Sequence, residues 1–289
     1  MESSARTDSF LALLTPWRLG HSPGFQSPKS KSMEIDLDQL SAWVLSFLWP
    51  FARVAAMISA APLTGARTLP ARVRLVFALV LTWVIHPLVG PVPDLDPLSP
   101  AGILVVGNQI LIGAAMGLAL QVAFNALLIG GHIIGSSMGL GFASIIDPQN
   151  GVQLPLVSQF YFLIGALVFL ALGGHLMIVE VTARSFDTLP VSTSGLAPDM
   201  LLGLALWSGL MFSEGMRRAL PVVSVILLIN LSLGVATRAA PQLNIFALGF
   251  SITLMLGLVG MLLTLGNLGP LFTNVLDQGF QMVWSLAGA

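Results

Sequence analysis

One stretch of the sequence limits the possible folds more than any other: the 46 residues from Ala101 to Ile146 contain no Asp, Glu, Lys or Arg. An apolar run of about 18 residues or more predicts a membrane-spanning helix, because a helix pairs its backbone groups within the segment. As a single helix this run would be about 69 Å long, whereas the hydrocarbon core of a bilayer is about 30 Å thick. The segment must therefore bend, protrude into a protein assembly, or split near Gly130–Gly131.

Three further runs lack charged residues: 148–179, 219–237 and 239–276. Hydrophobic residues make up 55% of the 289 positions, charged residues only 9%, and the mean hydropathy is +0.90. A soluble domain is about 25% charged, so this chain has too few charges to cover a water-exposed surface. We therefore expect an all-α polytopic membrane protein made of long helical hairpins packed side by side.

Pro and charge clusters divide the chain into about six hydrophobic segments. The expected segments are 40–61, 75–92, 101–140, 156–179, 200–239 and 244–267. They form a single membrane-embedded domain over residues 33–289. Residues 1–32 are rich in Ser, Pro and basic residues, which predicts either a disordered extension or an upstream start with Met33 as the true initiator.

The basic connector that carries Arg67, Arg72 and Arg74 predicts the orientation of the first two segments. Short cytoplasmic loops are enriched in Arg and Lys, so this connector is expected on the cytoplasmic side. The acidic turn from Pro91 to Pro100 is then expected on the opposite side of the membrane.

Small residues mark one face of the long third segment. Gly113, Gly117, Gly131, Gly135 and Gly139 fall within a stripe of about 80° at 100° per residue. A neighbouring stripe carries polar side chains: Gln121, Asn125, His132 and Ser136. Small residues let helix backbones approach, and polar groups can bond across the contact. We expect this side of the helix to pack tightly against protein, either in this chain or in another.

Ionisable residues inside apolar segments are candidates for function, because each costs roughly 2.5–3.5 kcal/mol at the bilayer centre. Arg53 is one such residue. Glu214, Arg217 and Arg218 form a second group, with spacing that lets the carboxylate pair with either guanidinium. The alternative reading is a short interfacial corner between two half-spans, just before Pro221.

The sequence contains no pattern typical of an enzyme. Cysteine is absent, the histidines have no metal-ligand spacing, and no nucleophile–base pair or phosphate loop is evident. The formal net charge of −1 gives no basic patch for nucleic acid. We therefore expect no catalytic, cofactor or metal site. A transporter or channel, a membrane enzyme and a subunit of a larger complex remain as classes, and the enzyme has the least support.

Three separated motifs resemble the FliR family of flagellar export-gate subunits, which also has virulence-associated relatives. They are LPARVRLVFALVLTWVI at 69–85, the central stretch 109–151 with its Phe-Ala-x-x-x-Asp-Pro element, and the stretch 220–250 with Ala-Pro-Gln-Leu-Asn at 240–244. The resemblance runs from about Glu34 to Phe280.

This resemblance implies a non-enzymatic role in the bacterial inner membrane, at the flagellar basal body. Proteins of this kind form a secretion pore with FliP-like and FliQ-like subunits, next to FlhB-like and FlhA-like proteins, and unfolded export substrates pass through it. The runner-up function is a secondary transporter or channel for a small solute, which should show a repeat between its halves and an intramembrane coupling site.

The resemblance also implies that the turn-rich segment Gly141–Pro155 is a plug that closes the pore. The candidate plug residues are Phe142, Ile145, Ile146, Asp147 and Pro148. Gly and Pro mark turns of every kind, so an ordinary interhelical loop is the alternative.

Overall fold

The computed structural model describes residues 37–65, 69–141, 156–239 and 245–288, and every regular element in these ranges is a helix. The helices are α2 (Leu37–Ala60), α3 (Ala71–Ile85), the 3-10 turn η1 (His86–Leu88), α4 (Pro100–Ser137), α6 (Leu156–Ala171), α7 (Gly174–Thr188), α8 (Pro198–Ser208), α9 (Leu210–Ala239) and α10 (Ile245–Leu286). Residues Ala42–Ala289 form one compact unit, separate from Met1–Ser41.

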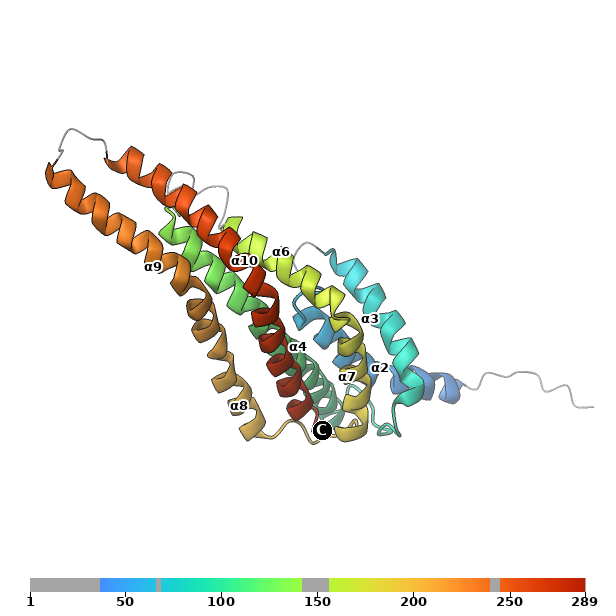
Figure 1. Ribbon diagram of the computed structural model, residues 1–289. Helices are drawn as coiled ribbons and strands as arrows, with labels where there is room; N and C mark the ends of the chain where they lie inside the picture. The colour runs from blue at the N-terminus through green and yellow to red at the C-terminus, as the bar shows by residue number, and fades with distance from the viewer. Residues whose placement is uncertain (1–36, 66–68, 142–155, 240–244, 289) are drawn as a thin grey trace, which may run out of the picture. The chain divides into compact units, whose positions relative to one another are not determined.

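Helix α4 is the central element of residues 42–289 and runs without a break through Gly130 and Gly131. The Ser99 hydroxyl begins it by accepting a hydrogen bond from the Gly102 amide, and Pro100 occupies its first turn. Its 38 residues correspond to about 57 Å. Helices α6, α9 and α10 pack against α4, with α9 and α10 antiparallel beside each other (Figure 1).

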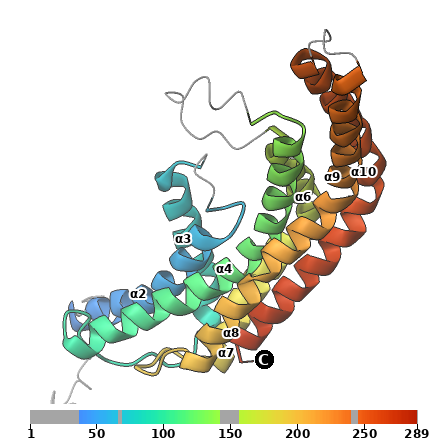
Figure 2. The ribbon, with the colours of Figure 1, turned by 90° about the vertical axis from the view of Figure 1, so that its left-hand side faces the viewer.

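Two hydrophobic clusters hold the helices together. The larger one joins α4, α6, α9 and α10 around Phe124, whose ring meets Phe272 edge-on at 5.2 Å and Phe169 at 5.6 Å between centroids. The smaller cluster includes Trp49, Ile85 and other residues of α2, α3, the start of α4 and the end of α7. Figure 2 shows α2 beside the N-terminal half of α4, and α9 and α10 along its other half.

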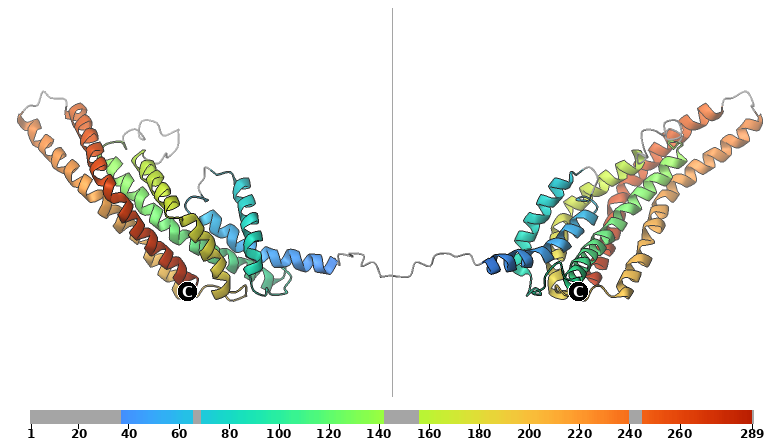
Figure 3. Two further views of the ribbon diagram at one scale, coloured as in Figure 1. Left: turned by 45° about the vertical axis from the view of Figure 1, so that its right-hand side comes forward. Right: turned by 180° about the vertical axis from the view of Figure 1, so that it is seen from behind.

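The fourth apolar run is bent rather than straight. Helix α6 ends at Ala171, Gly173 adopts a left-handed φ of 71°, and α7 leaves at 66° to α6. A side chain is disfavoured at positive φ, which glycine adopts without strain. Helix α7 then continues to Thr188, so the connector to α8 begins at Leu189 rather than near Glu180 as expected (Figure 3).

The predicted class, an all-α polytopic membrane protein, is confirmed. Within the described ranges, four helical stretches are long and apolar enough to cross a membrane: 71–88, 100–137, 198–236 and 249–286. The bent α6–α7 pair makes a fifth if it counts as one span. The estimate of about six segments is slightly high, because the apolar part of α2, Ser46–Ala60, is shorter than a full span.

Helix α10 is longer than expected. It passes through Pro270 and ends at Leu286, whereas the expected segment ended at Asn267. The added part is amphipathic, with Phe272, Val275 and Phe280 among its buried side chains and polar residues between them. Helical periodicity, and not overall hydropathy, determines this extension.

Candidate functional site

The four polar side chains predicted to share one face of α4 lie on its accessible side. Gln121 and Asn125 are half-buried, and Gln121 Nε2 donates a hydrogen bond to Asn125 Oδ1 at 3.4 Å. His132 and Ser136 are exposed further along the helix. Polar groups are costly against hydrocarbon unless they are hydrogen-bonded, so this part of α4 suits water or a polar protein surface.

The same face is apolar in the N-terminal half of α4. Five large side chains lie exposed there: Ile103, Leu104, Ile110, Leu111 and Leu118. At 100° per residue they fall on the stripe that continues through Gln121. The accessible face of α4 therefore changes from apolar to polar within one helical turn, between Leu118 and Gln121.

Two of the predicted glycines, Gly113 and Gly117, lie where α4 contacts α2. A Cβ atom on Gly117 would lie 2.6 Å from the Ala60 Cβ, and one on Gly113 would overlap the carbonyl oxygen of Arg53. Both glycines are buried. The absence of side chains lets the two backbones approach, as small residues do in membrane helix pairs.

The other three predicted glycines lie near the C-terminal end of α4. Gly131 contacts α6, where an added Cβ would lie 2.6 Å from the Ser158 Cα, and Gly135 is buried. Gly139 follows the helix with a φ of 85°. The Leu140 amide donates to the Gly135 carbonyl at 3.1 Å, and the Gly139 amide donates to the Ser136 carbonyl, also at 3.1 Å. These bonds form a Schellman-type cap, so Gly139 ends the helix.

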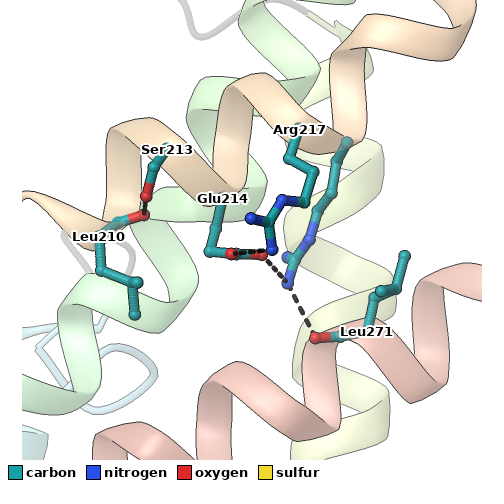
Figure 4. A network of polar contacts seen from close by, with 6 residues as sticks. Leu210, Ser213, Glu214, Arg217 and Leu271 are labelled. Atoms are coloured by element: carbon teal, nitrogen blue, oxygen red, sulfur yellow. Dashed lines mark hydrogen bonds and ion pairs between the residues drawn. The ribbon is translucent and has the colours of Figure 1, made fainter.

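Glu214, Arg217 and Arg218 lie in the first turns of α9, just after the short break at Gly209 and within the apolar stretch 198–236. Glu214 Oε1 contacts Arg217 Nη1 at 3.0 Å, while Glu214 Oε2 is 3.8 Å from Arg218 Nη2. Arg218 Nη2 also donates to the Leu271 carbonyl of α10 at 2.8 Å (Figure 4). The carboxylate thus pairs closely with one guanidinium and only loosely with the other.

The two arginines differ sharply in exposure. The Arg217 side chain is 75% exposed, whereas that of Arg218 is 9% exposed. Within the described part of the chain, Arg218 Nε and Nη1 are buried and have no hydrogen-bond partner. Arg217 is therefore a surface residue, and Arg218 carries a buried charge that the protein satisfies only in part.

A second glycine contact, which the sequence stripe did not include, lies beside this ion pair. A Cβ on Gly130 of α4 would lie 3.1 Å from the Gly215 carbonyl oxygen, and one on Gly215 would lie 2.9 Å from Ile129 Cγ2. Helices α4 and α9 therefore cross at closest approach here. A sequence signal existed only in Gly215 itself, since an isolated glycine inside a helix often marks a packing contact.

Arg53, the other ionisable residue in an apolar segment, is fully buried and joins three helices. Its Nε donates to Gln109 Oε1 of α4 at 2.8 Å, while Nη1 and Nη2 each donate at 2.7 Å to the carbonyls of Ser185 and Leu189. Its guanidinium lies 4.2 Å from the centroid of the Phe186 ring. The C-terminal end of a helix is partly negative, so the end of α7 stabilises this cation.

The candidate plug residues, Phe142 to Pro148, lie outside the described residues. Among the residues that are described, no group of three or more His, Cys, Asp or Glu side chains could hold a metal ion. In those ranges the geometry gives packing faces and two buried cations, Arg53 and Arg218.

Comparison with known proteins decides the family. Residues 44–279 match the model of bacterial export proteins, family 1. The chain belongs to the FliR family. It is 39% identical to the flagellar biosynthetic protein FliR of Pectobacterium carotovorum subsp. carotovorum over 244 residues. The matched region covers 84% of this chain and 92% of that relative. It is 34% identical to FliR of Escherichia coli strain K12 over 251 residues, 87% of this chain and 96% of the relative.

More distant FliR proteins match over the same length. The one from Aquifex aeolicus is 31% identical over 242 residues, 83% of this chain and 91% of its own length. The resemblance inferred from the three motifs is therefore confirmed. The FliR match spans the helices that carry the faces described above, from α2 to α10.

Proposed function

We propose that this chain is a non-enzymatic subunit of the flagellar type III protein export gate, and that it forms the secretion pore with FliP-like and FliQ-like subunits. Its family and the flagellar names of its relatives support this role. The proposed location is the inner membrane at the flagellar basal body, next to FlhB-like and FlhA-like proteins. Unfolded export substrates would pass through the assembled pore.

One observation carries the assembly proposal: the apolar helices are too long and too exposed for a bilayer alone. The apolar stretches 198–236 and 249–286 contain 39 and 38 residues, or about 57 Å of helix each. In an 18-residue apolar part of each stretch, only 17% is buried within the described chain. A bilayer covers about 30 Å. Exposed apolar surface beyond that length needs protein partners, because large apolar patches mark interaction sites.

The face of α4 supports the same proposal. Its polar half, from Gln121 to Ser136, extends about 23 Å at 1.5 Å per residue, and its polar side chains stay accessible. Hydrogen bonds to a neighbouring subunit, or contact with the water-filled conduit, would satisfy these groups. The apolar half, from Ile103 to Leu118, would face lipid or an apolar subunit surface.

The segment Gly141–Pro155 would close the pore at rest. A narrow hydrophobic constriction excludes water and blocks ions, and Phe142, Ile145 and Ile146 are the apolar side chains for that role. Asp147 and Pro148 would set the turn that positions them. This part of the proposal rests on the resemblance of the segment to the family's plug loop.

Purification of the full-length chain in mild detergent tests the proposal. FliP-like and FliQ-like subunits should co-purify with the wild-type protein. Asn125→Leu should reduce their recovery at least several-fold while the chain still inserts, because the half-buried amide lies on the accessible face. Leu98→Ala, an exposed position in the turn before α4 and outside this face of the helix, is the control and should retain the partners. A monomer that binds a small solute would overturn the gate and favour a secondary transporter.

A further inference from the structure

A small cavity next to Arg218 has no role in the proposed gate. Four helices surround it: α4 contributes Leu127 and Gly130, α6 contributes Tyr161, α9 contributes Arg217, Arg218 and Pro221, and α10 contributes Thr264, Asn267, Leu268 and Leu271. Its volume is about 120 Å³, about four times the volume of one water in the liquid, ~30 Å³. Drug-sized ligands need about 300 Å³ or more, so the cavity admits only a compact group.

The charge around this cavity is not balanced. Arg217 and Arg218 line the cavity and bring two positive charges, and the described residues that line it include no acidic side chain. Glu214, which contacts both arginines, brings one negative charge. Glu214 contacts Arg217 at 3.0 Å but Arg218 only at 3.8 Å. One positive charge therefore remains, and it lies mainly on the more deeply buried guanidinium.

The hydrogen bonding of Arg218 is also incomplete. Nη2 donates to the Leu271 carbonyl at 2.8 Å, while Nε and Nη1 are buried and lack partners within the described ranges. A buried donor without a partner destabilises the folded chain, and more so when it is charged. Water in the cavity could accept these hydrogen bonds, but water would not neutralise the charge. An anion would do both.

We propose that this cavity binds one compact monovalent anion, of the size of chloride or formate, held by the unpartnered N–H groups of Arg218. The mostly apolar wall formed by Leu127, Leu268 and Leu271 raises the local strength of that charge interaction, because water screens it less. The anion would link α9 to α10 next to the Gly130–Gly215 crossing. Bound there, it would stabilise the folded chain by an amount that rises with the logarithm of its concentration once that concentration exceeds the dissociation constant.

Thermal unfolding of the full-length chain in detergent tests this site, with chloride titrated at constant ionic strength against gluconate, which is too bulky for the cavity. We expect the Tm to start rising near the dissociation constant of chloride and then to increase by about 4 °C for each tenfold increase in chloride concentration. Formate should act in the same way. Arg218→Gln should abolish the rise. Arg184→Gln removes an arginine whose side chain is 64% exposed and lies outside the cavity, so this control should keep it.

Glu214→Gln separates anion binding from a purely structural role of this cluster. It removes the negative charge that contacts Arg217 and Arg218, so the Tm should begin to rise at a several-fold lower chloride concentration even if the variant is less stable. If Arg218→Gln does not fold, equilibrium dialysis of radioactive chloride with the wild-type chain should give one site that formate displaces. Equal Tm values in chloride and gluconate, an effect retained in Arg218→Gln, or no saturable chloride binding would each overturn the proposal.

Discussion

Gly130 of α4 and Gly215 of α9 meet across the crossing of their helices, where a Cβ on Gly130 would lie 3.1 Å from the Gly215 carbonyl oxygen. Glu214 and Arg218 flank this contact in sequence, and α10 receives the hydrogen bond of Arg218. The buried guanidinium of Arg218 therefore lies next to the point where the backbones of α4 and α9 approach each other.

Gly215→Ala should destabilise the chain, although alanine favours helix over glycine by about 1 kcal/mol. Its Cβ would meet Ile129 Cγ2 at 2.9 Å and the Ala126 carbonyl oxygen at 3.0 Å. Forced overpacking typically costs about 1–3 kcal/mol, so the net effect should be a lower Tm. The measurement is thermal unfolding in detergent.

Gly203→Ala in α8 is the matched control, because no atom lies within 4 Å of the added Cβ. It should raise the Tm or leave it unchanged. We expect Gly215→Ala to lower the Tm and Gly203→Ala to raise it or leave it unchanged. A stabilised Gly215→Ala variant would mean that α4 and α9 do not approach closely at this position.

Arg53→Ala should destabilise the chain by about 3 kcal/mol or more, because it leaves the buried Ser185 carbonyl and the half-buried Leu189 carbonyl without these donors. Arg53→Lys should be intermediate, since one ammonium group cannot reproduce the planar fork of arginine. Arg72→Ala is the control, and as an exposed position it should stay within about 0.5 kcal/mol. Equal stability of the Arg53 and Arg72 variants would contradict the role of Arg53 as the joint of α2, α4 and α7.

The helices themselves could largely be predicted from charge-free runs, because only helices satisfy the backbone in such apolar sequence. The bends between helices and the exact helix ends could not be predicted in this way. The bend after α6 depends on the left-handed φ of Gly173, and hydropathy alone does not distinguish that glycine from Gly174 beside it. The C-terminal half of α10 was missed because its polar residues lower the hydropathy while the 3.6-residue pattern continues.

The candidate site was likewise only partly predictable. The glycine stripe and the polar stripe of α4 could be calculated from sequence spacing, since each depends only on the angle between residues in one helix. The partners across the stripe required the tertiary structure: Gly113 and Gly117 lie against α2, and Gly131 lies against α6. The unequal exposure of Arg217 and Arg218, neighbours in sequence, likewise depends on where α10 packs.

The predicted orientation can be checked with a phosphatase reporter that is active only outside the cytoplasm. A reporter inserted after Arg67, in the basic connector that precedes α3 in the sequence, should be inactive, because basic short loops stay on the cytoplasmic side. The same reporter in the turn between Asp94 and Asp96 should be active. The two sites flank α3, so they must lie on opposite sides if this helix spans the bilayer. Reversed activities would overturn the orientation, and equal activities would show that α3 does not span.

Deletion of Ser144 to Gln153 should leave the gate assembled but make the membrane permeable to small ions. A pore wide enough for an unfolded chain conducts ions unless a dry apolar constriction fills it, and this deletion removes Ile145 and Ile146. The expected results are normal recovery of FliP-like and FliQ-like subunits, slower growth and raised membrane conductance. A replacement that exchanges Ile145 and Ile146 for Leu keeps the apolar volume and should stay closed. A tight membrane with an assembled deletion variant would show that another element seals the pore. Failure to assemble would show instead that the segment is structural, and the plug would lose its support.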